Sequence, residues 1–359
     1  MVTAEAIIHL PSIQHNYRYL KSLCGDNPLI AVIKGDAYGH SARDVALALP
    51  DADMFAVARI EEAIELRESG VDTEILLLEG CFCLEDLQLA SRYQFQLVIH
   101  HLSQLEQFEN TALDKPISVW LKLDTGMHRV GIQSDEVEYF AKRIARSTNI
   151  EGELNFLSHF SCADDLLSQK TQQQISNFSN LTDAYKGKKS IANSAGLLFW
   201  PNSHYDVARS GIALYGISPV EDHTGAELNL KPVMTLKTRL ISVREHQKSQ
   251  PVGYGEMWHS TQDTSIGVIA MGYGDGYPRL APEGTPVWIN GRQVPIVGRV
   301  SMDMITVDLG SESQDKIGDD VELWGSQLPI EKVAKAIGTI PYELTIKLTQ
   351  RVVKTFVGL

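Results

Sequence analysis

The chain has 359 residues, of which 43% are hydrophobic and 21% are charged, and these values are typical of globular proteins rather than of disordered chains. Its 45 acidic and 32 basic residues give a net charge of −13 without a run of like charges, which argues against a surface for nucleic acid or anionic membranes. The length predicts two domains. We therefore expect its partners to be small molecules or copies of the chain itself.

Compartment and metal content are also indicated by the composition. The N-terminus lacks a basic segment followed by a long apolar one, and no stretch approaches the ~20 apolar residues that span a membrane. The four cysteines, Cys24, Cys81, Cys83 and Cys162, show no CxxC spacing, which is typical of free thiols in a reducing compartment. The 11 histidines show no metal-ligand spacing. We expect a cytoplasmic protein without a metal site.

Apolar runs typical of buried parallel strands alternate with helical patterns through the first part of the chain. A strand-like segment at 4–10 and a helix from residue 12 to about 24 come first. The runs then follow at 29–33, 54–58, 75–78, 95–99, 117–123, 154–160, 189–193 and 206–214. Eight β/α units predict a (β/α)8 barrel rather than a smaller doubly wound sheet.

A different pattern follows the barrel-like region. Short alternating strands with Gly and Pro turns replace the β/α rhythm, and only one clear helix, at 329–338, is predicted among them. The fold class is therefore α/β, with an N-terminal (β/α)8 barrel at 9–231 and a mainly β domain at 232–359. Residues 1–8 are expected to add a strand to the second domain.

Reactive side chains stand where the predicted barrel strands end, which is where barrel enzymes build their active sites. A lysine at the end of a buried strand can form a Schiff base with a carbonyl compound because desolvation lowers its pKa, although by itself such a lysine is more often simply solvated. Small, glycine-containing turns at 193–196 and 209–212 are typical of phosphate-holding loops. Together these features suggest pyridoxal 5′-phosphate as cofactor. The strand-end residues are Lys34, Lys122, Asp124, His159, Asn193, Ser194 and Arg209.

The segment AVIKGDAYGH (31–40) resembles the cofactor-lysine motif of the alanine racemases, AVIKANAYGHG. The resemblance extends over nearly the whole chain, in the family's order, and is closest to the forms from Gram-negative bacteria. It implies a homodimeric, fold-type III pyridoxal-phosphate enzyme that interconverts L-alanine and D-alanine, for peptidoglycan or for alanine catabolism. The further matching blocks are LKLDTGMHRVG (121–131), SHFSCAD (158–164), NSAG (193–196), RSGIALYG (209–216), PVGYGEMW (251–258), GYGDGYPR (272–279) and VGRVSMDM (297–304).

The resemblance assigns catalytic roles to two residues. Lys34 would bind the cofactor covalently and act as one acid/base, and Tyr254 of the partner subunit would act on the opposite face of the substrate. Racemisation needs such a pair because the α-proton leaves one face and returns to the other. A tyrosine pKa lowered from ~10 to about 7 requires ~4 kcal/mol of preferential phenolate stabilisation, which a chain through His159 to Arg209 would supply.

The resemblance also assigns binding roles. Arg129 and the backbone of Met302 would bind the substrate, Asp303 would support them, and Lys122 would be a carbamylation site that steadies Arg129. His159 would stack on the cofactor ring and Arg209 would meet its nitrogen. The remaining cofactor-binding residues would be Tyr38, Asn193, Ser194, Gly211 and Ile212.

The chain departs from the family pattern at a few positions. Gly35, Asp36 and Ser41 replace Ala, Asn and Gly of the lysine motif, and Ser301 replaces a Cys found in some relatives. Gln350 stands where the family's second gate tyrosine is expected, so that position does not supply the usual phosphate anchor.

Three alternatives differ in chemistry. A same-fold amino-acid decarboxylase would place an acidic residue, not Arg209, at the ring nitrogen. A non-catalytic pyridoxal-phosphate carrier would resemble the barrel alone and would lack Tyr254. A racemase of another or broader specificity would share the motifs, because one sequence does not define the width of the pocket.

Overall fold

The computed structural model describes residues 4–358, so residues 1–3 of the predicted first strand lie outside the described part. The chain forms two compact units. One is Asn16–Leu214, and the other combines the chain before Asn16 with the chain from Tyr215 onward. Helix α1 (Leu10–Leu23) passes from the second of these units into the first.

The unit Asn16–Leu214 is built on eight parallel strands in the order β8-β7-β6-β5-β4-β3-β2-β9. The backbone N–H groups of Val207 and Arg209 donate to the carbonyls of Lys189 and Ala192 at 3.2 and 3.1 Å, which joins β9 to the β8 segment and nearly closes the ring. The predicted (β/α)8 barrel is therefore confirmed. The strands are β2 (Leu29–Val32), β3 (Met54–Val57), β4 (Ile75–Leu77), β5 (Gln96–Ile99), β6 (Val119–Lys122), β7 (Asn155–Leu157), β8 (Lys189–Ser190) and β9 (Ala208–Ser210).

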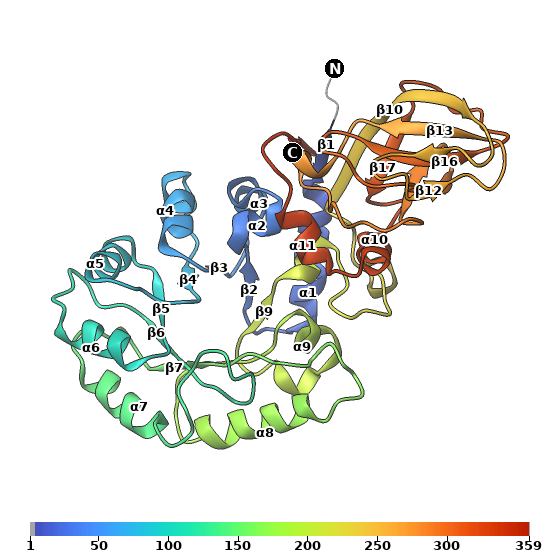
Figure 1. Cartoon of the computed structure of the whole chain (residues 1–359). Coiled ribbons are helices and arrows are strands. Elements are labelled where there is room, and N and C mark those ends of the chain that lie inside the picture. The colour runs from blue at the N-terminus through green and yellow to red at the C-terminus, as the bar shows by residue number, and fades with distance from the viewer. Residues whose placement is uncertain (1–3, 359) are drawn as a thin grey trace. The chain divides into compact units, whose positions relative to one another are not determined.

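Helices cover the outer side of this ring, as Figure 1 shows for α4 to α8. The strands β2, β3, β4 and β6 are buried along their whole length, as expected for parallel strands enclosed on both faces. The helices are α2 (Lys34–Gly39), α3 (Ala42–Ala48), α4 (Ile60–Glu68), α5 (Leu84–Tyr93), α6 (Leu102–Asn110), α7 (Val137–Arg146), α8 (Lys170–Thr182) and α9 (Ser194–Phe199), with 3₁₀ turns at Pro201–Ser203 and Ile212–Tyr215.

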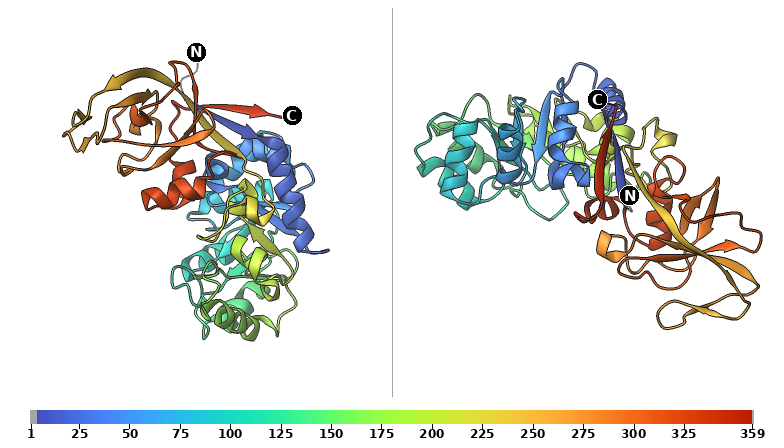
Figure 2. Two further views of the ribbon diagram at one scale, coloured as in Figure 1. Left: turned by 90° about the vertical axis from the view of Figure 1, so that its right-hand side faces the viewer. Right: turned by 90° about the horizontal axis from the view of Figure 1, so that it is seen from above.

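The other unit is mainly β, as predicted (Figure 2). Its long strand β10 (Met234–His246) pairs with β1 (Glu5–His9), β13 (Thr264–Ile269) and β17 (Asp320–Trp324). Strand β1 also pairs in parallel with the last strand, β18 (Val353–Val357). The remaining elements are β11 (Pro251–Val252), β12 (Trp258–His259), β14 (Pro286–Ile289), β15 (Arg292–Pro295), β16 (Ile305–Gly310), α10 (Ile330–Ile337) and α11 (Pro341–Ile346), with 3₁₀ turns at Ala226–Leu228 and Tyr273–Asp275.

Several elements differ from their predicted extent. The last barrel strand is shorter than the run at 206–214 because the chain leaves the sheet after Ser210 and enters a 3₁₀ turn at Ile212. A second late helix, α11, follows α10; it has six residues and begins at Pro341, a residue suited to a first helical turn.

Candidate active site

Lys34 stands at the carboxyl end of β2, where the backbone turns sharply. The next four residues, Gly35 to Tyr38, form one left-handed helical turn, with φ between 53° and 62°. Such a turn is costly for L-residues but not for glycine, and least costly for Asp and Asn among the others. The replacements Gly35 and Asp36 therefore suit this backbone. Asp36 also accepts a hydrogen bond from the N–H of Ala42 at 2.8 Å, at the start of α3.

Glu62, on α4, ties this turn to the neighbouring β/α loop. Its carboxylate accepts hydrogen bonds from the backbone N–H groups of Gly35 at 2.6 Å, Ala58 at 2.9 Å and Arg59 at 3.1 Å. Ionised acceptors make stronger hydrogen bonds than neutral ones. The backbone that follows Lys34 is thus held by a charged group on a different element.

Both cations and carboxylates influence the Lys34 amine. Burial lowers the pKa of Lys34, and the positive charges of Arg129 and, less strongly, Arg209 lower it too, whereas the carboxylates of Glu79 and Glu62 raise it. Burial likewise lowers the pKa of Lys122 to about 7, again with contributions from Arg209, Arg129 and Lys34. Among residues 4–358, none of the ion pairs involves these four basic side chains. Arg129 is exposed, but Lys122 and Arg209 are buried and Lys34 is half-buried, and buried cations without a paired carboxylate predict an anionic ligand.

Arg209 and His159 are polar residues that contact each other near the barrel strand ends. Arg209 is only 4% exposed, and its guanidinium donates to the Ser190 hydroxyl and to the Ser158 carbonyl, both at 2.6 Å. Burial lowers the Arg209 pKa to about 10, so the group stays protonated at neutral pH. Nη2 of Arg209 lies 3.4 Å from Nδ1 of His159. Because arginine only donates, Nδ1 accepts and the imidazole proton belongs on Nε2.

The pKa of His159 lies well below its usual value, chiefly because of burial and secondly because of Arg209. The ring is therefore neutral at physiological pH. A neutral imidazole with its proton on Nε2 can donate one hydrogen bond while it accepts another from Arg209.

A second group of predicted residues meets where β9 ends. The Ser194 hydroxyl accepts hydrogen bonds from the backbone N–H groups of Gly211 at 3.0 Å and Ala213 at 3.3 Å, and it lies 3.3 Å from the Ser210 hydroxyl. A Cβ atom on Gly211 would lie 2.5 Å from the Tyr38 hydroxyl, so only glycine fits there. Ile212 follows as a buried residue, and the Asn193 side chain accepts from the N–H of Gly196 and caps α9.

The other predicted site residues lie in the β-rich unit. Tyr254 is 71% exposed and stands between Gly253 and Gly255, both with left-handed φ, so it projects from a tight turn. Met302 is 52% exposed, and its carbonyl accepts from the N–H of Gly274 at 2.8 Å.

Asp303, beside Met302, is held by an ion pair. Arg351 contacts Asp303 at 2.7 Å and the buried Asp275 at 3.0 Å, which joins three loops of the β-rich unit. Arg351, which makes both ion pairs, directly follows Gln350, the position where the family pattern places a tyrosine.

Sequence reasoning missed the residues that hold the site in place. Glu62, Gln174 and Arg351 are polar residues in segments that read as solvated surface, and each acts on a loop distant in sequence. The position of Gln174 on its helix could have predicted that its side chain is buried, because it shares the buried face of α8 with Thr171 and Phe178.

Among residues 4–358, no three His, Cys, Asp or Glu side chains cluster as they would around a metal ion. In the same described part, none of the helices combines the length and apolar character of a membrane span.

The fold and this site define a class: a (β/α)8-barrel enzyme with a partly desolvated strand-end lysine, an excess of positive charge and a serine and glycine turn suited to a phosphate. Residues 8–219 match the family model described as alanine racemase, N-terminal domain, and residues 233–356 match the one described as alanine racemase, C-terminal domain. The chain belongs to the alanine racemase family.

Individual relatives agree over the full length. An alanine racemase of Aeromonas hydrophila is 51% identical over 357 residues, covering 99% of this chain and 100% of the relative. The crystal structure of the biosynthetic alanine racemase from Pseudomonas aeruginosa has a TM-score of 0.97 at 44% identity and covers 100% of both chains. The alanine racemase from Bartonella henselae with covalently bound pyridoxal phosphate has a TM-score of 0.89 at 30% identity, covering 99% of this chain and 100% of that one.

Proposed function

We propose that this chain interconverts L-alanine and D-alanine by a two-base mechanism with pyridoxal 5′-phosphate, in a homodimer whose subunits share their active sites. The observation that carries the proposal is the Lys34 amine, whose pKa is lowered by burial and by Arg129, at the carboxyl end of a barrel strand. The full-length similarity to alanine racemases supports the choice of substrate.

The residues present fit this cofactor. When bound, pyridoxal phosphate draws electrons away from the Cα–H bond of the amino acid and so acidifies the α-proton. Lys34 would hold it covalently, His159 would stack on its ring, and Arg209 would donate to the ring nitrogen. The phosphate would be held by Tyr38, Ser194, Gly211 and Ile212, with Asn193 shaping the turn. A carboxylate at the position of Arg209 would instead favour decarboxylase-type chemistry.

Two proton-transferring groups complete the mechanism. Lys34 removes the α-proton of D-alanine, and Tyr254 of the partner subunit removes that of L-alanine; each returns a proton when the other has acted. His159 supports the tyrosine because its Nε2 proton can donate to a phenolate while Nδ1 accepts from Arg209. The exposed position of Tyr254 is compatible with insertion into another subunit.

Arg129, together with the Met302 backbone, would bind the alanine carboxylate, and Asp303 would support that loop. Lys122 would carry a carbamate: its neutral amine attacks CO₂, forms an N–C bond and releases one proton. A pKa of about 7 leaves a large neutral fraction at physiological pH. The resulting anion would pair with Arg129.

We place the reaction in the cytoplasm, and the four cysteines, all free thiols in the structure, support a reducing compartment. The product would supply D-alanine for peptidoglycan, or the reverse reaction would serve alanine catabolism.

The test incubates the purified protein with L-alanine in heavy water and follows both chirality and deuterium at Cα. D-alanine carrying deuterium is the expected product. Deuterated L-alanine without inversion would contradict the role of Lys34 as the second acid/base, because only the face served by Tyr254 would then exchange its proton. Absence of exchange would contradict the proposal, and release of CO₂ would indicate the decarboxylase.

A further inference from the structure

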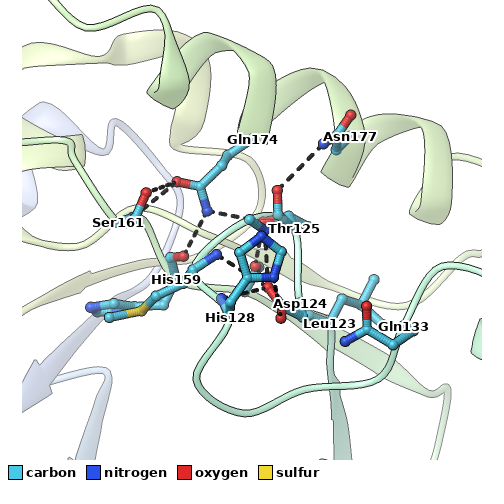
Figure 3. A network of polar contacts seen from close by, with 12 residues as sticks. Leu123, Asp124, Thr125, His128, Gln133, His159, Ser161, Gln174 and Asn177 are labelled. Carbon is cyan, nitrogen blue, oxygen red and sulfur yellow. Dashed lines mark hydrogen bonds and ion pairs between the residues drawn. The ribbon is translucent and has the colours of Figure 1, made fainter.

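Gln174 on α8 is a buried amide between two site loops. It is 2% exposed, and its side chain makes four hydrogen bonds, the full capacity of an amide (Figure 3). Oε1 accepts from the backbone N–H of Ser161 at 2.9 Å and from its hydroxyl at 3.0 Å. Nε2 donates to the carbonyl of His159 at 3.0 Å and to Oγ1 of Thr125 at 3.3 Å.

The direction of these bonds follows from the donors. A backbone N–H can only donate, so the amide atom facing Ser161 is the oxygen, and the nitrogen faces His159 and Thr125. Thr125 then has its own proton for the Ser158 hydroxyl at 2.7 Å, and Ser158 donates to the carbonyl of Leu123 at 2.9 Å. Reversing the amide, or replacing its nitrogen by an acceptor, would break this order.

His159 is consequently held from two sides. Gln174 fixes its carbonyl, and Arg209 contacts both its ring and the carbonyl of the preceding Ser158. The imidazole ring is attached to the backbone of residue 159, so a displacement of the His159 carbonyl also moves the ring. Nε2, the atom proposed to face the phenolate, then changes its position.

We infer that Gln174 is a positioning residue that sets the orientation of His159 and thereby the rate of proton exchange on the Tyr254 face of the substrate. This inference rests on the proposed function. The four hydrogen bonds of the Gln174 side chain go to Ser161, Thr125 and the His159 carbonyl, so it acts through His159 and leaves the Lys34 face largely unaffected.

The test variant is Gln174→Glu, which keeps the shape of the side chain but places an oxygen against the His159 carbonyl. The chain offers a matched control in Gln173→Glu, an exposed position on the same helix with the same change of charge. Gln174→Met, which fills the same volume without hydrogen bonds, removes the charge effect. Thr125→Val removes the other branch of the network and keeps the bond to His159.

The readout is the initial loss of the α-deuterium from L-[2-²H]alanine and from D-[2-²H]alanine, measured on the cofactor-loaded enzymes. In Gln174→Glu and Gln174→Met we expect exchange from L-alanine to fall by about 30-fold and exchange from D-alanine to change by less than about 3-fold. Gln173→Glu should match the parent protein, and Thr125→Val should not separate the two faces.

Equal losses on both faces would overturn the inference, because they would show that Gln174 only supports the fold. Unchanged exchange in both Gln174 variants would overturn it as well. A parent protein that exchanges neither enantiomer would instead contradict the proposed function, so the two failures are distinguishable.

Discussion

The two units of the chain present their predicted site residues in opposite ways. In the barrel, Lys122, Ser194 and Arg209 are buried. Hydrogen bonds to neighbouring strands and loops hold the side chains of Ser194 and Arg209 in place. In the β-rich unit, Tyr254 and Met302 are largely exposed. The predicted site residues of the barrel are therefore fixed by their surroundings, whereas those of the β-rich unit are open to contact with another surface.

This difference assigns different tasks to the two sets. Buried, fixed dipoles and charges stabilise developing charge without reorganising, which suits the cofactor and the anionic groups of the substrate. In the proposed homodimer, the exposed tyrosine would reach its working environment when the partner subunit covers it. We therefore expect changes in the barrel to affect binding and chemistry together, and changes at Tyr254 to affect one face of the substrate.

The largest effect should come from Lys34→Ala. It removes the group proposed to bind the cofactor and to act as one of the two bases, so racemisation should fall by about 10⁴-fold or more. The assay is the appearance of D-alanine from L-alanine, with the absorbance of bound cofactor recorded alongside. Lys142→Ala, an exposed lysine on α7, is the control and should behave like the parent protein. An active Lys34→Ala protein would remove the barrel lysine from the mechanism.

Tyr254→Phe should lower racemisation by about 10³-fold, since it removes one acid/base group and little else. The two directions must fall equally because the equilibrium between the enantiomers is symmetric. The α-proton of D-alanine should nevertheless still exchange with solvent, because Lys34 remains. Tyr139→Phe, another exposed tyrosine, should leave both rates unchanged. Loss of D-alanine exchange in Tyr254→Phe would argue against two separate bases.

Lys122→Met should stabilise the protein in CO₂-free buffer. The folded-state pKa of about 7 lies below the ordinary lysine value of 10.5, so burying Lys122 costs free energy. The sign follows from proton binding: between these two values the unfolded state binds more protons, so the cost is full below pH 7 and disappears as pH rises toward 10.5. At pH 8 the free energy of unfolding of Lys122→Met should exceed that of the parent protein by on the order of 2–3 kcal/mol.

The measurement is urea unfolding of the parent and the variant from pH 7 to pH 10. The gap between the two should narrow with rising pH. Added bicarbonate should stabilise the parent alone, because only Lys122 can form the proposed carbamate. A gap that is independent of pH would show that the pKa of Lys122 is not lowered on folding, so that its amine stays protonated in the folded protein.

The sequence predicted the barrel and its reactive strand ends because both depend on local patterns. A continuous apolar run such as 29–33 can only be a buried strand or a short buried helix segment, and its regular recurrence decides the matter. The residues at the ends of these runs then share one rim of the barrel by topology. Lys34, Lys122, His159 and Arg209 follow from this rule, and the structure links them electrostatically.

The supporting residues could not be predicted in this way. Glu62 and Gln174 lie within helices whose exposed faces are polar. The contact of Glu62 with Gly35 spans 27 residues in sequence, and the partners of Gln174 are between 13 and 49 residues away. Their roles depend on which loops the fold brings beside a helix. The left-handed turn after Lys34 was equally hidden, because Ala37 and Tyr38 have no preference for positive φ and adopt it only through the contacts around them.

Ser194→Ala should give the smallest effect and sharpens the comparison within the barrel. It removes the hydroxyl that accepts from the N–H groups of Gly211 and Ala213, so these two donors lose their partner. A bound phosphate oxygen can replace part of that interaction, which limits the cost to about 1–2 kcal/mol, or roughly 10-fold in cofactor affinity. The affinity is measured by fluorescence titration of the apoenzyme, with the exposed Ser176→Ala as control. Since the acid/base groups are unaffected, the maximal rate at saturating cofactor should stay within about 2-fold of the parent. A lower maximal rate with unchanged affinity would place Ser194 near the reacting atoms rather than at the phosphate.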